Sequence, residues 1–576
     1  MRFFGSRKPI LFGTLGLLAA ALACQQSSSR PAQPPPAPAP QYDLLIVNGH
    51  IIDGTGSPWY KGSVAIKDGK IAAIGRLRRP SAKRTIDAHG LVVAPGFIDL
   101  HSHSDYTLLA DGNAQSKIRQ GVTTEIIGES ASAGPVEGPA AAPLERSLGQ
   151  MGLKLDWTTL GQYFSRLQKH GISVNIASYV GSGQVWDDVI GNVDRRPTPA
   201  EMDKMKELVD QAMRDGAIGL SSALIYVPNR YLTTDDLVEL ARGAAPYGGI
   251  YTSHIRGEGA TVLQAVGEAI EIGRRAGIPT HILHMKVAGK LNWGKMKQVV
   301  ALVDQARSQG VDVTGDVYPY VASSTTLQVC FPPKFLEGTS AQVVTRLRDP
   351  KVRAEIKREL APGAPYWVGS HVLDSGGWQG VMVASVHDPA DKPYEGKRMD
   401  EVARMMREDP VDALCDLLIR EGGNAGGIYF MMDESDVEGA LRQPWVGVGS
   451  DGSAVNPQMP FAGHPHPRYY GTFPRVLGVY VRQRKIIALP EAIRKMTALA
   501  AQITGLTDRG VLRPGLAADL VILDPETVID QATFADPQQY PLGIPYVVVN
   551  GVVVVDNGKH TGAHPGRVLY GRGHAS

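Results

Sequence analysis

The middle of the chain alternates short apolar strands with amphipathic helices, and this alternation limits the possible folds most strongly. The clearest helix begins at Thr198, where Glu201 completes a capping box around Pro199, and it ends at Gly216. The strand and helix pattern then repeats through residues 217–317. Repeated units of this kind build parallel sheets, and so many in series favour a closed (β/α)₈ barrel over an open Rossmann sheet. No Gly-x-Gly-x-x-Gly or Walker sequence opens a helix, so no nucleotide site is predicted.

Short β segments with hairpin turns lie at both ends of this region, within residues 43–74 and 519–556. Two such segments around a long middle most simply pair with each other. We therefore predict a small β-sandwich made of residues 42–92 and 506–576, with the barrel, residues 93–505, inserted between its halves. A charged helical stretch at 342–359 interrupts the alternation, which predicts an inserted lid around 330–440; the alternative is an ordinary long connection.

Composition excludes several classes of function. The 576 residues carry 59 Lys and Arg against 57 Asp and Glu, so the chain lacks the basic field that nucleic-acid binding requires. Its 3 cysteines cannot form a disulfide framework, and no Cys or Cys/His spacing suggests a structural zinc finger. The length allows a large core, so stability must come from apolar packing.

The first residues have the pattern of an export signal. Basic residues precede an apolar run at 9–23 that is too short for a spanning helix. The run ends in Ala-Leu-Ala before Cys24, which resembles a bacterial lipobox; an ordinary signal-peptidase site with an incidental cysteine is the alternative. Residues 25–41 are rich in proline and typical of a linker. We expect residues 1–24 to be a signal peptide, Cys24 to be lipidated, and the protein to be periplasmic or membrane-anchored.

Histidines and one aspartate follow several predicted strands. His101 and His103 come after an apolar strand and share a face, His254 and His284 end two further strands, and Asp451 ends the strand at 446–450. Barrel enzymes assemble their sites at the carboxyl ends of their strands. A single histidine is more often structural, but four at such positions indicate a metal site. Imidazole nitrogens and carboxylate oxygens suit zinc, and zinc sites with open positions carry out hydrolysis.

Longer motifs surround these residues. They are GFIDLHSHSD (96–105), GVTTEIIGES (121–130), SHIRGEG (253–259), ILHMKVAG with NWGK (282–295), DVYPYVASSTTL (316–327), GSDG (449–452), HPRYYGTFPRVLG (466–478), and GLAADLVILDPETVIDQATF with PLGIPYVVVNG (515–551). Through them the chain resembles the amidohydrolase superfamily and, within it, the N-acyl-D-amino-acid deacylases. The resemblance covers residues 42–570. His-x-His marks only the superfamily. The motif around Lys286 (ILHMKVAG), YPY and HPR-x-x-GTFPR mark the deacylase branch.

The resemblance implies a role for each residue of the predicted site. His254 and His284 would hold the tighter zinc ion, and His101 and His103 a second, weaker one. Asp451 would act as general acid and base.

The resemblance also implies how a substrate is held. Lys286, Tyr318 and Arg468 would grip its α-carboxylate. A guanidinium, an ammonium and a phenol in one pocket would select an anion.

The chain departs from the family at one position. The deacylases place a metal-bridging cysteine where this chain has Ser130. A neutral serine is a poor replacement for a thiolate, so Glu129 is the expected substitute ligand. In an ideal strand its side chain would start from the opposite face, so a bulge or loop is needed there. The number of metal ions stays open.

We therefore expect a zinc-dependent hydrolase acting on linear amide bonds of small N-acyl amino acids, and the resemblance implies those of the D series. A cyclic-amide or dipeptide hydrolase on the same scaffold is one alternative. A surface lipoprotein that binds a ligand without catalysis is another. The membrane would be contacted only through the lipid anchor.

Overall fold

The computed structural model describes residues 41–78, 80–361, 370–459 and 462–574. The predicted signal peptide, Cys24 and nearly all of the predicted linker fall within residues 1–40, which lie outside these ranges. Residues 41–576 form one compact unit. In the described part of the chain, no helix has the length and apolar character needed to cross a bilayer.

Parallel strands form a closed ring at the centre of this unit. In order around the ring they are β6 (Phe97–Asp99), β7 (Val122–Ile127), β8 (Asn175–Ser178) with β9 (Val180–Gly181), β10 (Gly219–Ala223), β11 (Ile250–His254), β12 (Thr280–Ile282), β13 (Val313–Val317) and β17 (Val446–Val448). β8 and β9 flank Tyr179 and are halves of one strand, which pairs with β7 and then with β10. The ring closes where Ser102 pairs with Gly452. This confirms the predicted (β/α)₈ barrel.

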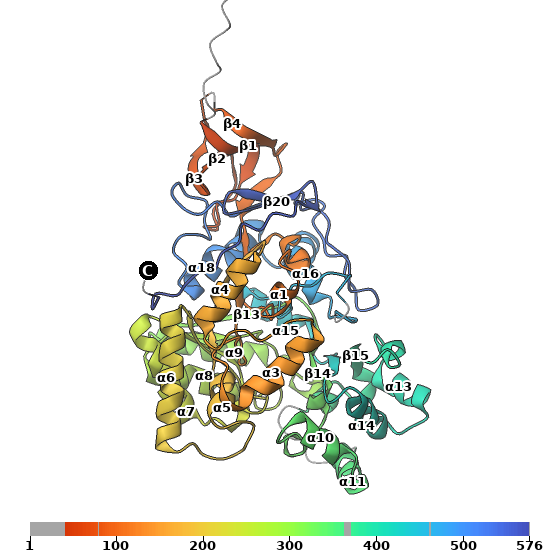
Figure 1. The fold of residues 1–576 in the computed structure, drawn as a ribbon. Helices are drawn as coiled ribbons and strands as arrows, with labels where there is room; N and C mark the ends of the chain where they lie inside the picture. Colours follow the sequence, from red (N-terminus) through yellow and green to blue (C-terminus); the bar gives the residue numbers. More distant parts are fainter. Residues whose placement is uncertain (1–40, 79, 362–369, 460–461, 575–576) are drawn as a thin grey trace, which may run out of the picture. The chain divides into compact units, whose positions relative to one another are not determined.

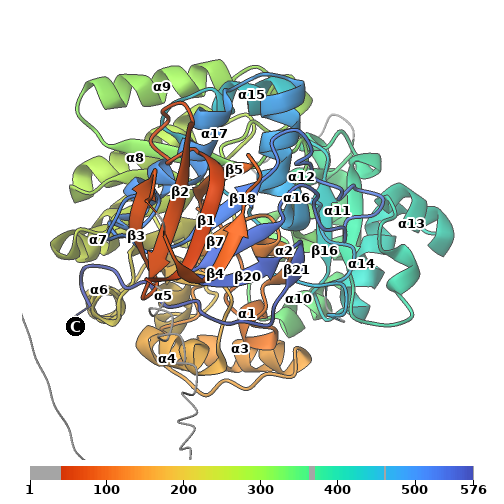
Figure 2. The same ribbon diagram turned by 90° about the horizontal axis from the view of Figure 1, so that it is seen from above.

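Helices cover the outside of the ring, as Figures 1 and 2 show for α6 (Pro199–Asp215), α7 (Thr234–Ala244), α8 (Val262–Ala276) and α9 (Met296–Ser308). The predicted capping box at Thr198 is confirmed, and Gly216 ends α6 with a φ of 112°. The strand before His284 is shorter than predicted. It ends at Ile282, so His284 lies in the following loop with a φ of 35°.

Both ends of the unit contribute to one nine-stranded sheet. Its strands are β1 (Tyr42–Ile51), β2 (Tyr60–Lys67), β3 (Lys70–Gly75), β4 (Ala82–Asp87), β5 (Val92–Pro95), β18 (Leu520–Leu523), β19 (Tyr546–Val549), β20 (Val552–Asp556) and β21 (Lys559–His560). The two halves meet where β5 pairs antiparallel with β18, in a register that sets Ala94 beside Val521. The predicted pairing of the terminal segments is therefore present.

Some domain limits differ from those expected. β5 extends the terminal sheet to Pro95, because its residues pair with β18 rather than with a barrel strand. The end of the chain leaves this sheet, and Val568 pairs with Ile176 of the barrel. Near the end of the expected lid, α15 (Glu434–Leu441) packs against α9, β13 and β17 as a barrel helix.

An insertion lies between β13 and α15. Its antiparallel sheet has the order β14 (Ser323–Thr326), β16 (Gly426–Tyr429) and β15 (Val381–Ser385). Its longer helices are α10 (Ser340–Leu347), α11 (Pro350–Glu359), α13 (Met399–Met406) and α14 (Pro410–Arg420). Figure 1 shows these helices gathered on one side of the barrel. The predicted helical stretch at 342–359 is two helices, since Asp349 caps α11 just before Pro350.

A buried ion pair supports the closure of the ring. The Lys117 ammonium lies 2.7 Å from Asp99 Oδ2, and both side chains are fully buried. Lys117 also donates to Ser450 Oγ at 2.5 Å and to the Gly452 carbonyl at 2.7 Å. One lysine therefore ties the end of β6 to the loop after β17.

We predict that Lys117→Met lowers the free energy of unfolding by about 3–5 kcal/mol, because Asp99 would be left as a buried, unpaired charge. Denaturant unfolding followed by circular dichroism measures this. The control is Lys206→Met, which removes a surface ion pair with Asp203 and should change stability by less than about 1 kcal/mol. Equal effects of the two substitutions would contradict the prediction.

Candidate metal centre and substrate cavity

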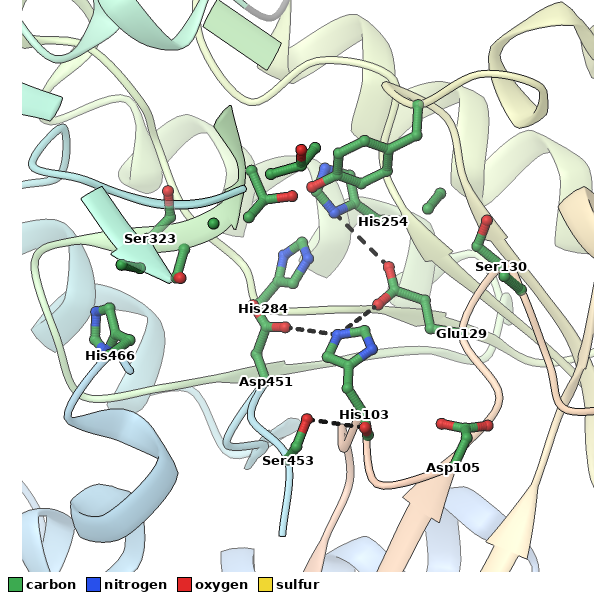
Figure 3. A pocket seen from close by; sticks show the side chains of 18 of the residues that line it. His103, Asp105, Glu129, Ser130, His254, His284, Ser323, Asp451, Ser453 and His466 are labelled. Atoms are coloured by element: carbon green, nitrogen blue, oxygen red, sulfur yellow. Dashed lines mark hydrogen bonds and ion pairs between the residues drawn. The ribbon is translucent and has the colours of Figure 1, made fainter. Parts of the chain in front are cut away.

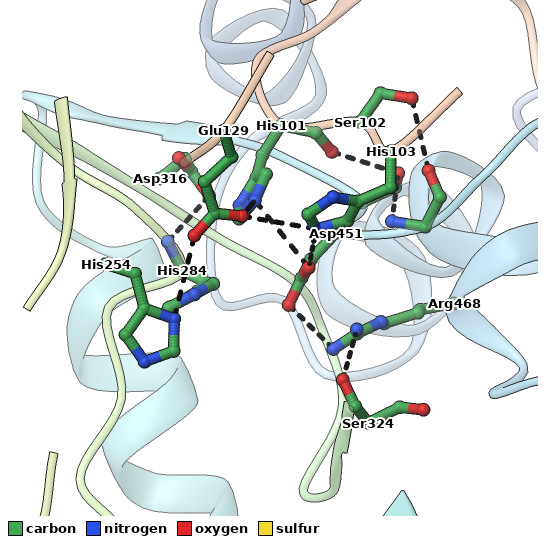
Figure 4. Close-up of polar contacts among 12 residues, drawn as sticks. His101, Ser102, His103, Glu129, His254, His284, Asp316, Ser324, Asp451 and Arg468 are labelled. Atoms are coloured by element: carbon green, nitrogen blue, oxygen red, sulfur yellow. Dashed lines mark hydrogen bonds and ion pairs between the residues drawn. The ribbon is translucent and has the colours of Figure 1, made fainter. Parts of the chain in front are cut away.

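The predicted metal ligands meet at the carboxyl end of the barrel. His101 and His103 follow β6, His254 is the last residue of β11, His284 follows β12, and Asp451 follows β17. Figure 4 shows these side chains directed toward one another, with the Glu129 carboxylate between them. Strands far apart in the sequence thus bring the histidines and acids to one place.

Glu129 lies at the centre of the cluster. Its Oε2 is 2.7 Å from His101 Nε2 and 3.2 Å from His103 Nε2, and its Oε1 is 3.7 Å from His254 Nδ1. The backbone makes this position possible, because Gly128 ends the strand pattern with a φ of 90°. A Cβ at Gly128 would overlap the Tyr179 carbonyl oxygen as well as Ser178 Oγ, so a side chain does not fit there. The loop that Glu129 needs is therefore present.

Two groups of ligand atoms share Glu129. One comprises His101, His103, Glu129 and Asp451, and the other Glu129, His254 and His284; within each group the atoms lie within 4.8 Å of one another. Glu129 Oε1 is buried and has no hydrogen-bond partner in the structure. An unpartnered carboxylate oxygen facing an imidazole nitrogen fits a bound cation, and this donor set fits zinc. The residues can hold two ions with Glu129 between them.

Ser130 takes no part in either group. Its hydroxyl accepts a hydrogen bond from Asn229 Nδ2 at 2.8 Å, and its amide donates to Ser221 Oγ at 2.9 Å. Ser130 is thus hydrogen-bonded to Asn229 and Ser221, while its neighbour Glu129 faces the histidines.

The protein environment controls the charges of the cluster. Burial, with the nearby Lys286 charge, lowers the pKa of His254 and holds the pKa of His284 well below its ordinary value. Burial would also lower the pKa of His101, but the Asp451 and Glu129 carboxylates outweigh it and raise that pKa. Neutral imidazoles are the form that binds metals, so His254 and His284 are already suited to this role.

Asp451 lies between the histidines and a buried arginine. Its Oδ1 is 2.9 Å from His103 Nε2, and its Oδ2 is 2.8 Å from Arg468 Nη1. Burial would raise the pKa of Asp451, but the charges of Arg468 and His101 dominate and hold it well below its usual range. Arg468 and His101 therefore favour the charged form of Asp451.

The predicted carboxylate-binding residues lie close together, but only two of them line the cavity. Arg468 and Lys286 line the cavity, whereas Tyr318 is not among the lining residues. The Tyr318 ring lies 4.8 Å from the Arg468 guanidinium, and its hydroxyl lies 3.9 Å from Met432 Sδ. Tyr318 thus supports Arg468 from behind, because an aromatic face attracts a cation.

A cavity of about 660 Å³ opens over the cluster. In Figure 3, Glu129, His103, His254 and Asp451 surround its centre, with Ser323 and His466 on one side and Asp105 and Ser130 on the other. The insertion supplies part of the wall through β14, Ser385 and Gly426. This volume is typical of a small-molecule site.

Sequence reasoning missed several residues of the site. Glu258 contacts Lys286 at 2.7 Å, and Asp316 accepts from the His284 amide at 3.0 Å and pairs with His281 at 2.8 Å. Both acids lie inside motifs that the sequence displays, SHIRGEG and DVYPY. Their position within a motif was the available signal. Neither acid directly follows a strand, since Asp316 lies inside β13 and Glu258 lies in the loop after β11.

Comparison with known proteins is consistent with this geometry. The sequence profile described as the amidohydrolase family matches residues 84–555. The D-aminoacylase of Alcaligenes xylosoxydans xylosoxydans is 35% identical over 531 residues, which cover 92% of this chain and 97% of that protein. The N-acyl-D-glutamate deacylase of the same organism is 35% identical over 533 residues, covering 92% and 96%.

A solved structure is also similar. The N-acyl-D-glutamate deacylase of Bordetella bronchiseptica, crystallised with zinc and a phosphonate inhibitor that mimics the tetrahedral intermediate, superposes with a TM-score of 0.77. It is 33% identical, and the match covers 92% of this chain and 99% of that one.

We predict that Glu129→Ala weakens zinc binding by more than the roughly 10–100-fold typical of an outer-sphere partner, because both ligand groups lose their shared carboxylate. Ser130→Ala is the matched control and should keep the zinc content of the wild type. Metal analysis after dialysis measures both. Equal zinc retention by Glu129→Ala would show that Glu129 is not a ligand.

Proposed function

The chain belongs to the amidohydrolase family and, within it, to the branch of the N-acyl-D-amino-acid deacylases, and on that basis we propose that it hydrolyses N-acyl-D-amino acids to a carboxylate and the free amino acid. The observation that carries the proposal is the position of Asp451. It touches the histidine cluster through Oδ1 and the buried Arg468 through Oδ2. Proton transfer and recognition of an anion thus occur side by side.

Zinc held by the histidines and Glu129 would polarise the amide carbonyl and lower the pKa of a water molecule. Asp451 accepts the proton of that water and delivers it to the leaving nitrogen, which are the two proton transfers that amide cleavage needs. The first transfer needs the charged form of Asp451, which Arg468 and His101 favour.

Arg468 is the main candidate for holding the α-carboxylate. Its Nε is buried and has no hydrogen-bond partner among the described residues, while Nη2 donates to the Ser324 carbonyl at 3.0 Å and fixes the guanidinium. An α-carboxylate is separated from the scissile nitrogen by a single carbon. An arginine 2.8 Å from Asp451 therefore matches a substrate whose anion adjoins the reacting amide.

The two alternatives differ in what a substrate screen would find. A cyclic-amide or dipeptide hydrolase would act on a hydantoin or a dipeptide but not on simple N-acetyl-D-amino acids. A ligand-binding lipoprotein would turn over none of these compounds. A panel of N-acyl D- and L-amino acids, hydantoins and dipeptides separates the three, with release of a free amine as the readout.

We expect Asp451→Asn to lower kcat for the best N-acyl-D-amino acid by about 10²–10⁴-fold, because the amide cannot accept the proton. Asp508→Asn, an exposed acid beside Arg509 and outside the cavity, should leave kcat unchanged. Unchanged turnover in Asp451→Asn would remove the aspartate from the mechanism.

The proposal includes a location in the bacterial envelope. The export pattern of residues 1–24 and the lipobox-like sequence before Cys24 support it, and the proline-rich linker would separate the lipid from the enzyme. Substrates would then come from outside the cytoplasm.

Cys24→Ala should move the protein from the membrane fraction to the soluble fraction of the producing bacterium and abolish labelling by a radioactive fatty acid, because the acylated thiol is removed. Cys415→Ala, which changes a buried cysteine, is the control and should not alter either result. Labelling that persists in Cys24→Ala would contradict lipidation at this residue.

A further inference from the structure

Glu258 lies on the side of the histidine cluster opposite Glu129. It belongs to the loop between β11 and α8 and is 7% exposed. Its Oε1 alone is 2.7 Å from the Lys286 ammonium, 3.3 Å from His284 Nδ1 and 3.6 Å from His254 Nε2. A single carboxylate oxygen therefore faces both histidines of one ligand group.

The two histidines present opposite ring nitrogens to the two carboxylates. His254 directs Nδ1 toward Glu129 and Nε2 toward Glu258. His284 directs Nδ1 toward Glu258, which leaves Nε2 for a metal. A metal ligand nitrogen must be free of hydrogen, so the other nitrogen of each ring must carry it, and a carboxylate is the partner that accepts it.

Lys286 favours the opposite arrangement at His284. Its Nζ lies 2.8 Å from His284 Nδ1. An ammonium can only donate, so this contact requires a bare Nδ1 and places the hydrogen on Nε2, the nitrogen needed by the metal. Glu258 and Lys286 thus compete for one ring nitrogen while forming an ion pair with each other.

We propose that Glu258 is a positioning residue of the metal centre: its carboxylate accepts a hydrogen bond from His284 Nδ1, 3.3 Å away, and attracts the hydrogen of His254 Nε2, which lies 3.6 Å away and has no hydrogen-bond partner among the described residues. In this way Glu258 keeps the opposite nitrogens available for zinc. Lys286 opposes this effect at His284, because its contact with Nδ1 favours the ring form whose hydrogen is on Nε2. The inference rests on the zinc-dependent function proposed above and assigns a task within that site to a residue outside both ligand groups.

The test compares zinc affinities measured by competition with a chelator, without substrate. Glu258→Gln keeps the size of the side chain but removes the charged acceptor, and we expect its zinc affinity to fall by about 10–100-fold. Lys286→Met removes the competing donor, so its affinity should equal or exceed that of the wild type. Glu271→Gln changes an exposed acid of α8 paired with Arg274 and should have no effect.

The opposite signs separate positioning from simple support of the fold. If Glu258 and Lys286 only supported the fold as an ion pair, both substitutions would disturb the site and weaken zinc binding alike, and the proposal would be overturned. Wild-type affinity in Glu258→Gln would overturn it as well. The visible spectrum of the cobalt-substituted protein gives a second readout, and we expect it to change in Glu258→Gln, because the imidazole ligation changes, but not in Glu271→Gln.

Thermal unfolding of the metal-free proteins checks that each variant is folded. If Glu258→Gln does not fold, Glu258→Asp replaces it; the shorter carboxylate cannot reach both rings, and a loss of zinc affinity is again expected. The result is independent of the substrate. Weaker zinc binding in a protein that hydrolyses no N-acyl amino acid would refute only the proposed function, whereas full hydrolysis with unchanged affinity in Glu258→Gln would refute only this inference.

Discussion

The closure of the barrel between β6 and β17 is the constraint on which the site depends. Ser102 pairs with Gly452 across this seam, and the Asp451 amide donates to the His101 carbonyl at 2.8 Å. The same pairing sets the Asp451 carboxylate beside His103. The buried Lys117 stabilises this closure by donating to Ser450 Oγ and to the Gly452 carbonyl. Asp451, the proposed general acid and base, is therefore positioned beside the histidines by main-chain pairing rather than by a flexible side-chain contact.

The cluster also shows how a carboxylate can take the central position next to a serine. The neutral Ser130 hydroxyl accepts a hydrogen bond from Asn229 and supplies no anion between the histidines. Here the positive φ of Gly128 turns the chain so that Glu129 faces both pairs of histidines. Because one carboxylate belongs to both ligand groups, occupancy of one group is expected to affect the other.

Much of this arrangement could be predicted from the sequence. The alternating pattern and the capping box at Thr198 predicted the barrel and α6, since both depend on local sequence. The histidines and Asp451 could be found because they follow strands. The SHIRGEG motif includes Glu258, but its role could not be predicted, because that role depends on which ring nitrogens face it. The direction of the Tyr318 hydroxyl depends equally on packing around Met432, which no local pattern encodes.

The sheet formed by both ends of the folded unit has a consequence for how the protein is made. β5 finds its partner β18 only after nearly the whole barrel has been synthesised. Until then β5 presents an unpaired edge, and pairing that spans so much sequence is slow. A ribosome would thus release a chain whose terminal sheet is still incomplete. If the protein is exported as proposed, this delay would keep the newly made chain competent for passage through a translocation channel.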